Sequence, residues 1–168
     1  LGQGNRTQLG YYARDMDDNL TRVDLGTGKT AVAIAAGTEH TAVILNDGSV
    51  KAWGLNTYGQ LGLGNTEHMG NDADEMGDDL SAVDLGTGRT AVAIAAGNSI
   101  TGVILDDGTV KVWGFNSSGA LGQEHYSNIG DDPNEMGDNL PAVDLGTGKT
   151  AVDIAIGGNH VVVLLNDG

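Results

Sequence analysis

Apolar residues occur in short runs that are separated by glycine-rich polar segments. One run, AVAIAAG at 31–37, is too short for a helix of ordinary length and ends in glycine. The next two, TAVIL at 41–45 and SVKAW at 49–53, are rich in residues that favour strands. Between them stands NDG at 46–48, and Asn or Asp followed by Gly is the strongest short-range hairpin signal. The pattern therefore predicts three strands, the last two joined by a tight turn.

Apolar and polar side chains alternate in the third of these strands. Successive side chains of a strand point to opposite faces, so we expect Val50 and Ala52 on one face and Lys51 and Trp53 on the other. Convincing helical periodicity and helix-capping signals are missing from the sequence.

The whole pattern returns with an offset of 60 residues. AVAIAAG recurs at 91–97 and as AVDIAIG at 151–157, and VILNDGSVKAWGLN at 43–56 recurs as VILDDGTVKVWGFN at 103–116. We interpret the chain as three repeat units: 1–60, 61–120 and an incomplete unit 121–168. Self-similarity at such a period indicates a repeat architecture.

A further extended segment precedes each glycine-rich turn. LTRVDL at 20–25, LSAVDL at 80–85 and LPAVDL at 140–145 are predicted to supply a fourth strand. Four short antiparallel strands and one long acidic loop per unit are typical of a β-propeller blade. We therefore predict an all-β fold with about three blades of a partial propeller.

One long stretch carries a family resemblance. IAAGTEHTAVILNDGSVKAWGLNTYGQLGLGN at 34–65 is similar to the repeat of the regulator of chromosome condensation family. The resemblance implies a seven-bladed propeller with an aromatic residue, here Trp53 and Trp113, packed between blades. Seven units of this length need about 420 residues, so we expect the chain to be part of a longer array. We then expect the open blade faces to be covered by further blades, by another copy or by a partner, because each blade of a repeat array packs against its neighbours.

The segment DLGTGKT at 24–30 invites comparison with a phosphate-binding loop. That motif requires G-x-x-x-x-G-K-[ST] followed by a helix. Val23 stands where the first glycine belongs, and the strand candidate at 31–37 follows. The same mismatch recurs at 84–90 and 144–150. We predict tight turns, with no nucleotide or other cofactor.

Charge narrows the range of partners. Eight basic residues face 23 acidic ones, for a net charge of −15. Such a surface repels nucleic acid and anionic membranes, and it attracts basic proteins. No segment is apolar for long enough to insert into a membrane as a helix. Cysteine is absent, which excludes disulfides and thiolate chemistry.

Histidines and acidic loops are the remaining candidates for chemistry. His40 and His160 are in register, but Ile100 occupies that position in the middle unit, which favours a packed, hydrogen-bonded imidazole. Asp72-x-Asp74 resembles the start of a calcium loop, but the later ligand positions are apolar. We predict no catalytic or metal site, and calcium binding in another geometry stays open. Methionines that recur in the acidic loops are predicted to anchor them: Met16, Met76 and Met136.

The favoured function is a non-enzymatic module that binds a protein partner. Positions that differ between units while the strands barely change define the expected binding rim: Tyr58, His68, Asp72, Asp74, His125 and Asp132. One alternative is an architectural subunit that contacts further blades or another subunit through its open ends. Another, implied by the resemblance, is nucleotide exchange on a small GTPase, although the sequence offers no motif that carries this activity over.

Overall fold

The computed structural model describes residues 2–7 and 9–168. Its regular elements are short strands and single 3₁₀ turns. In chain order they are η1 (Ala13–Asp15), η2 (Asp17–Asn19), β1 (Ala31–Ala36), β2 (His40–Leu45), β3 (Val50–Gly54), η3 (Ala73–Glu75), η4 (Gly77–Asp79), β4 (Ala91–Ala96), β5 (Ile100–Leu105), β6 (Val110–Gly114), η5 (Gly137–Asn139), β7 (Ala151–Ile156) and β8 (Val161–Leu165). The helical segments in this part of the chain are single turns, and none of them could span a membrane.

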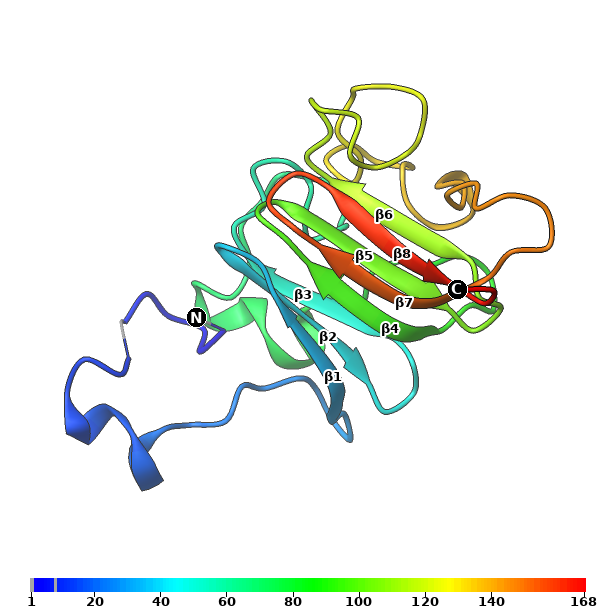
Figure 1. The fold of residues 1–168 in the computed structure, drawn as a ribbon. Coiled ribbons are helices and arrows are strands. Elements are labelled where there is room, and N and C mark those ends of the chain that lie inside the picture. Colours follow the sequence, from blue (N-terminus) through cyan, green and yellow to red (C-terminus); the bar gives the residue numbers. More distant parts are fainter. Residues whose placement is uncertain (1, 8) are drawn as a thin grey trace.

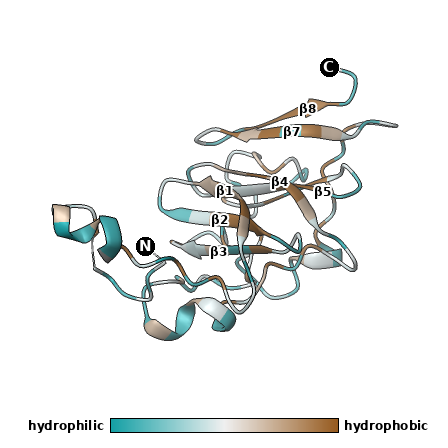
Figure 2. Ribbon diagram, turned by 90° about the horizontal axis from the view of Figure 1, so that it is seen from below, coloured by the Kyte–Doolittle hydropathy of each residue, from teal (hydrophilic) through white to brown (hydrophobic). Residues whose placement is uncertain are grey.

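The strands form three separate antiparallel sheets that follow one another along the chain. Their strand orders are β1-β2-β3, β4-β5-β6 and β7-β8, which we call blade 1, blade 2 and blade 3. The blades lie side by side, and β1, β4 and β7 are the strands that approach one another (Figure 1). Seen from below, β7 and β8 form the outermost layer at one end (Figure 2). The prediction of an all-β partial propeller of about three blades is confirmed.

The number of strands per blade differs from the prediction. The segments 20–25, 80–85 and 140–145 are extended but form no regular strand. Each of the latter two donates one main-chain hydrogen bond to the preceding blade, from Val83 N to Val50 O and from Val143 N to Val110 O, both at 2.8 Å. Segment 80–85 forms no strand because its two ends pack in different places. Leu80 packs in the core of blade 1, whereas Leu85 packs in the core of blade 2. The segment therefore crosses the sheet edge and does not run along it.

The hairpin between β2 and β3 forms as predicted. Leu45 N donates to Ser49 O at 2.8 Å, and Gly48 adopts a φ of 78° that few other residues adopt. The predicted alternation in β3 also holds. Val50 joins the core shared with blade 2, whereas Trp53 packs with Met76 on the opposite face. Both faces of the strand are buried because blades and loops cover it on both sides.

The glycine-rich segment at 24–30 is a turn, and β1 follows it. Gly26 and Gly28 have φ values of 104° and 70°, and Lys29 N donates to Gly26 O at 3.1 Å. Lys29 forms an ion pair with Asp47 of the neighbouring hairpin. A strand, not a helix N-terminus, follows the turn, so the prediction of a tight turn is confirmed.

Glycines bring the first strands of successive blades into close contact. A Cβ atom added at Gly97 would lie 2.1 Å from the main-chain oxygen of Gly157, and one at Gly37 would lie 2.5 Å from that of Gly97. Thr38 N also donates to Gly97 O at 3.2 Å. Only a residue without a side chain fits here, because main chain meets main chain between blades.

Candidate interaction surface

One end of the blades carries most of the loop residues. The turn 37–39 between β1 and β2 is joined to the start of the long loop after β3 by a hydrogen bond from Leu55 N to Glu39 O at 2.8 Å. In blade 2 the matching bond runs from Phe115 N to Ser99 O at 2.9 Å. The loop rim, as we call this surface, comprises residues 37–39, 55–75, 97–99 and 115–135.

Buried asparagines hold the two long loops in shape. Asn56 accepts a hydrogen bond from Leu61 N at 2.9 Å and donates one to Asn65 O at 2.8 Å. Asn116 does the same with Leu121 N, at 3.0 Å, and His125 O, at 2.8 Å. This role was not predicted, although both units place an Asn three residues after Trp, which is a usable signal. The loops are therefore ordered structures that present their outer side chains in fixed positions.

The loops of neighbouring blades also contact each other. The rings of Tyr58 and Phe115 meet edge to face with centroids 4.8 Å apart. The indole N–H of Trp113 donates to Gln60 O at 3.1 Å, and this Trp is fully buried. Tyr58, predicted as a rim residue, therefore packs against the neighbouring loop with one part of its ring and stays partly exposed. The prediction that the tryptophans pack between blades is confirmed for Trp113.

His68 borders a hollow of about 560 Å³ at the loop rim. Its Nδ1 accepts a hydrogen bond from Asn56 N at 3.0 Å, which leaves Nε2 as the protonated nitrogen of the neutral ring. Other polar groups that line the hollow belong to Arg6, Thr38, Glu39 and Asn71. Glu39 was not predicted as a rim residue. Its equivalents in the other two units are Ser99 and Asn159, so the difference between units that identified the other rim residues also identifies this position.

Asp72 and Asp74 lie beside this hollow, at the turn η3. Both side chains are exposed. An oxygen of Asp72 lies 3.5 Å from a guanidinium nitrogen of Arg6, and both partners are largely exposed. Glu75 turns back and accepts hydrogen bonds from the main-chain N–H groups of Asn71 and Asp72, each at 2.9 Å. The acidic residues therefore sit on a fixed turn, and Asp72 forms a solvent-exposed ion pair with Arg6.

His125 and Asp132 lie in the loop after blade 2. Both are exposed, and His125 borders a separate hollow of about 340 Å³. Asp132 N donates to Glu135 at 3.1 Å, which repeats the turn found at Asp72. The six predicted residues therefore share one end of the blades, in two loops, and do not converge on a single cleft.

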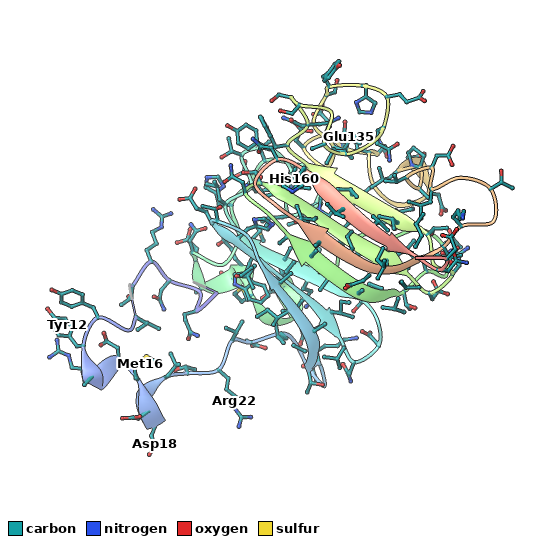
Figure 3. All side chains as sticks on the ribbon, in the orientation of Figure 1. Tyr12, Met16, Asp18, Arg22, Glu135 and His160 are labelled. Atoms are coloured by element: carbon teal, nitrogen blue, oxygen red, sulfur yellow. The ribbon has the colours of Figure 1, made fainter. Side chains whose placement is uncertain are left out.

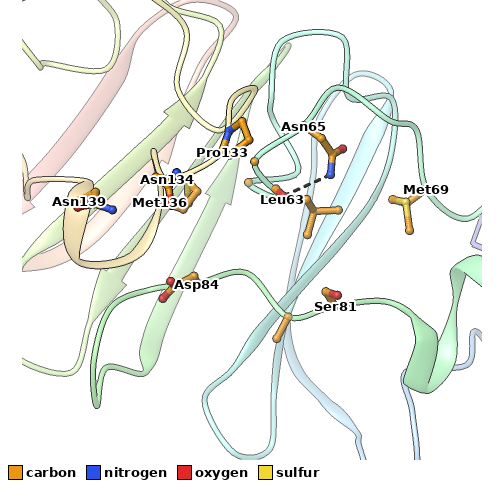
Figure 4. A pocket seen from close by; sticks show the side chains of 12 residues that line it. Leu63, Asn65, Met69, Ser81, Asp84, Pro133, Asn134, Met136 and Asn139 are labelled. Carbon is orange, nitrogen blue, oxygen red and sulfur yellow. Dashed lines mark hydrogen bonds between the residues drawn. The ribbon is translucent and has the colours of Figure 1, made fainter.

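A third hollow, of about 460 Å³, lies between the two loops and carries none of the predicted rim residues. Its wall includes Leu63, Asn65, Ser81, Asp84, Asn134 and Asn139 (Figure 4). Asn65 donates to Leu63 O at 3.3 Å, so this amide is partly used within the loop. Apolar side chains share the lining with amide and main-chain groups, and Asp84 is the one titratable side chain among the described residues of this wall, so no pair of groups is poised for acid–base chemistry.

The charge of the two long loops is one-sided. Residues 55–80 and 115–140 contain no Lys or Arg, and all the charged groups of these loops except the histidines are carboxylates. The acidic residues that these two loops contribute to the loop rim are Glu67, Asp72, Asp74, Glu75, Glu124, Asp131, Asp132 and Glu135, and the turn 37–39 adds Glu39. Among the described residues, no three His, Asp or Glu side chains are arranged to hold a metal ion.

The remaining histidine and methionine predictions hold only where a neighbouring blade is present. His40 is buried and bonds through Nε2 to Thr101 Oγ1 of blade 2, at 2.8 Å, whereas His160 is exposed. Met76 and Met136 are buried anchors, whereas Met16 is 44% exposed. For His160 and Met16 the prediction is wrong in this structure, because the described chain places no blade against either residue.

Comparisons with known proteins agree with this architecture. A profile of the regulator of chromosome condensation (RCC1) repeat matches residues 31–60 and 91–120, and a second profile of that repeat matches 47–74. The human X-linked retinitis pigmentosa GTPase regulator is 30% identical over 130 residues, which is 77% of this chain and 12% of the relative. The human E3 ubiquitin-protein ligase HERC2 is 29% identical over 122 residues, which is 73% of this chain and 2% of the relative.

Solved structures show the same fold at lower identity. Human WBSCR16 superposes with a TM-score of 0.69 at 20% identity, over 99% of this chain and 38% of that one. Prp20p from Saccharomyces cerevisiae gives 0.63 at 16% identity, over 97% and 37%. The chain thus spans well under half the length of its relatives. Its repeats, its blades and these matches together show that it belongs to the regulator of chromosome condensation repeat family.

Proposed function

We propose that this chain is a non-enzymatic protein-binding module that holds a basic partner against its acidic loop rim. The observation that carries the proposal is the absence of any Lys or Arg from 55–75 and 115–135, the two long loops of the rim, where carboxylates are exposed on ordered turns. Charge complementarity of this kind speeds association and selects partners.

The relatives support a protein as the partner. Yeast Prp20 is described bound to Kap60 in one solved structure and with binding properties to Gsp1p and histones in another. Histones are strongly basic, which fits the charge of the rim, and the fold itself supplies a rigid scaffold for the loops.

Charge reversal tests the proposal. We expect the double variant Asp72→Lys/Asp74→Lys to weaken binding to purified histones at least about tenfold in biolayer interferometry at physiological salt. Its melting temperature should change by less than about 2 °C, because both side chains are exposed. Asp18→Lys/Asp79→Lys is the matched control, since both carboxylates are exposed and lie outside the loop rim. Unchanged binding by the first variant, or equal loss in the control, would refute the rim as the binding surface.

A further inference from the structure

A glutamine ties down the extended segment that precedes the first strand in two of the three units. Gln3 Nε2 donates a hydrogen bond to Thr21 O at 2.9 Å, and Gln123 Nε2 donates one to Pro141 O at 3.0 Å. Donor and acceptor occupy equivalent positions in units 1 and 3. The glutamine side chain therefore bridges the start of each of these units and its extended segment.

The middle unit departs from this arrangement. Leu63 stands at the position of the two glutamines, and Ser81 at the position of the two acceptors. A leucine side chain donates no hydrogen bond, so the main-chain oxygen of Ser81 lacks the donor that its equivalents have. Leu63 and Ser81 both line the hollow of about 460 Å³ between the two long loops (Figure 4). An open space and an acceptor without that donor thus coincide.

This hollow is an internal feature of the array. Its walls come from the loop after blade 1, the loop after blade 2 and the segment 80–85 between them. Figure 3 shows Glu135 in the second of these loops, which projects beyond the sheets, and its carboxylate accepts hydrogen bonds from Gly130 N at 2.8 Å and Asp132 N at 3.1 Å. Because blades 1 and 2 are both present, the hollow does not depend on what covers the outer faces of blades 1 and 3.

The lining combines apolar surface with hydrogen-bond acceptors. Leu63, Met69 and Met136 supply apolar side chains. Asn134 and Asn139 line the wall that the loop after blade 2 provides, and each side-chain amide carries an oxygen that accepts hydrogen bonds (Figure 4). The hollow therefore suits a guest with an apolar stem and a head that donates hydrogen bonds.

The charge around the hollow is negative. Asp84 contributes a carboxylate to the lining. The ammonium of Lys111 is near, but both Asp84 and Asp138 act on it, and Arg89 is ion-paired with Asp107 at 2.7 Å. Carboxylates therefore outnumber cations at this place, and the two long loops that form the walls contain no Lys or Arg. Such a site favours a guest with a positive charge.

We propose that this hollow binds a lysine or arginine side chain of the partner. The apolar walls accept the methylene stem, and the charged head donates hydrogen bonds to Ser81 O and the amide oxygens, beside Asp84. The chain binds one of its own cations in a similar way, because the buried ammonium of Lys111 donates to Leu85 O at 3.0 Å and Gly137 O at 2.7 Å. The inference rests on the proposed function and deepens it by naming the group that is recognised.

Small cations test the hollow by themselves. The probes are n-butylguanidinium and n-butylammonium, which copy the two side chains, and the readout is ¹H–¹⁵N NMR of the unmodified chain. We expect saturable shifts of the main-chain amide signals of Leu63, Ala82 and Asn134, with a Kd of about 1 mM. n-Butyltrimethylammonium has the same charge and stem but no N–H group, and should bind at least about tenfold more weakly. Equal binding of this third probe, or no saturable shift with the first two, would overturn the proposal.

Leu63→Gln gives the middle unit the residue of the other two. The new amide should donate to Ser81 O and fill the hollow, so the affinity for both binding probes should fall at least about tenfold. Leu63→Met is the matched control, which stays apolar and should keep the affinity. Asp84→Asn keeps the acceptor for Gly86 N, at 2.9 Å, but removes the charge, and should weaken binding about threefold or more. Asp24→Asn, the same change in unit 1, should have no effect. Full probe binding by Leu63→Gln, or equal losses in the two Asp variants, would contradict the proposal.

The histone assay separates this inference from the proposed function. Leu63→Gln should weaken histone binding about fivefold or more, whereas Asp72→Lys/Asp74→Lys should still bind the small probes, because neither residue lines the hollow. Histone binding that falls in the charge-reversal variant but not in Leu63→Gln would overturn the hollow and leave the rim in place. Probe binding by a chain that binds no histone would support the hollow as a cation site and refute the rim.

Discussion

The imidazole of His40 in blade 1 lies 2.8 Å from the hydroxyl of Thr101 in blade 2. The Thr101 hydroxyl donates its hydrogen to Gln60 O at 2.7 Å, so it accepts from His40 and Nε2 carries the proton. Nδ1 is buried and has no hydrogen-bond partner in the described part of the chain. Burial lowers the pKa of His40 from 6.5 to about 4.

This relationship predicts a pH-dependent stability. The unfolded chain binds a proton at His40 near pH 6.5, whereas the folded chain resists it down to about pH 4. Stability from this site is therefore complete above pH 6.5 and falls as the pH drops towards 4, by about 3 kcal/mol in all. Urea unfolding at pH 7.5, 6, 5 and 4.5 measures the slope. Hydrogen bonds from Thr27 and Thr87 lower the pKa values of Asp78 and Asp138 below 3.8. The stability that these two carboxylates contribute is therefore lost only at a lower pH than the stability from His40.

The next interface suggests the variant that removes this slope. Where the first interface has His40 and Thr101, the second has Ile100 and Val161. We expect His40→Ile/Thr101→Val to unfold with the same free energy at pH 7.5, within about 1.5 kcal/mol, because an apolar pair replaces a polar one. Its stability should be flat from pH 6.5 to 4.5. His160→Gln, an exposed control, should keep the slope; a slope that survives the double variant would contradict the assignment to His40.

A second prediction concerns Lys51, which is buried. Its ammonium donates to Leu25 O at 3.0 Å and Gly77 O at 2.6 Å, and so ties the turn before β1 to the loop after β3. Lys51→Met leaves both carbonyls without this donor and should lower the unfolding free energy by about 2–4 kcal/mol. Denaturant melts measure the loss. Lys29→Met removes only a surface ion pair with Asp47 and should cost less than about 1 kcal/mol; similar losses in both would speak against the buried contacts.

A third prediction concerns the close contact between first strands. Gly97→Ala places a methyl group 2.1 Å from the main-chain oxygen of Gly157, and main chain cannot move aside as a flexible side chain does. We expect a loss of about 2–3 kcal/mol in thermal or denaturant unfolding. Gly158→Ala is the control, since an added Cβ there meets nothing within 4 Å. That variant should stay within about 0.5 kcal/mol. Equal stability of the two variants would show that the blades can separate at no cost.

A fourth prediction concerns the loop after blade 2. Asn116 donates to His125 O and Ser127 O and accepts from Leu121 N, so Asn116→Ala breaks three hydrogen bonds at once. We expect about 1–3 kcal/mol of lost stability and faster proteolytic cleavage within 117–127. Asn98→Ala, at an exposed turn, should change neither. Mass spectrometry of a timed digest locates the cuts, and unchanged protection of 117–127 would argue against this role.

Local patterns determined most of the blade. The hairpin at 46–48, the two faces of β3 and the turn at 24–30 follow from alternation and from residues that adopt unusual backbone angles. These features depend on neighbours along the chain, and the 60-residue period multiplies them. The binding rim could be proposed in the same way, because differences between units are visible in the sequence alone.

Contacts between units were decided only by the tertiary structure. The fourth strand is absent because Leu80 and Leu85 belong to different cores, a division that no local pattern reveals. His40 and His160 are the same residue in register, yet one is buried and the other exposed, because a blade covers only the first. A repeated sequence specifies one unit many times over, but burial, pKa and open surface depend on which neighbour each copy has.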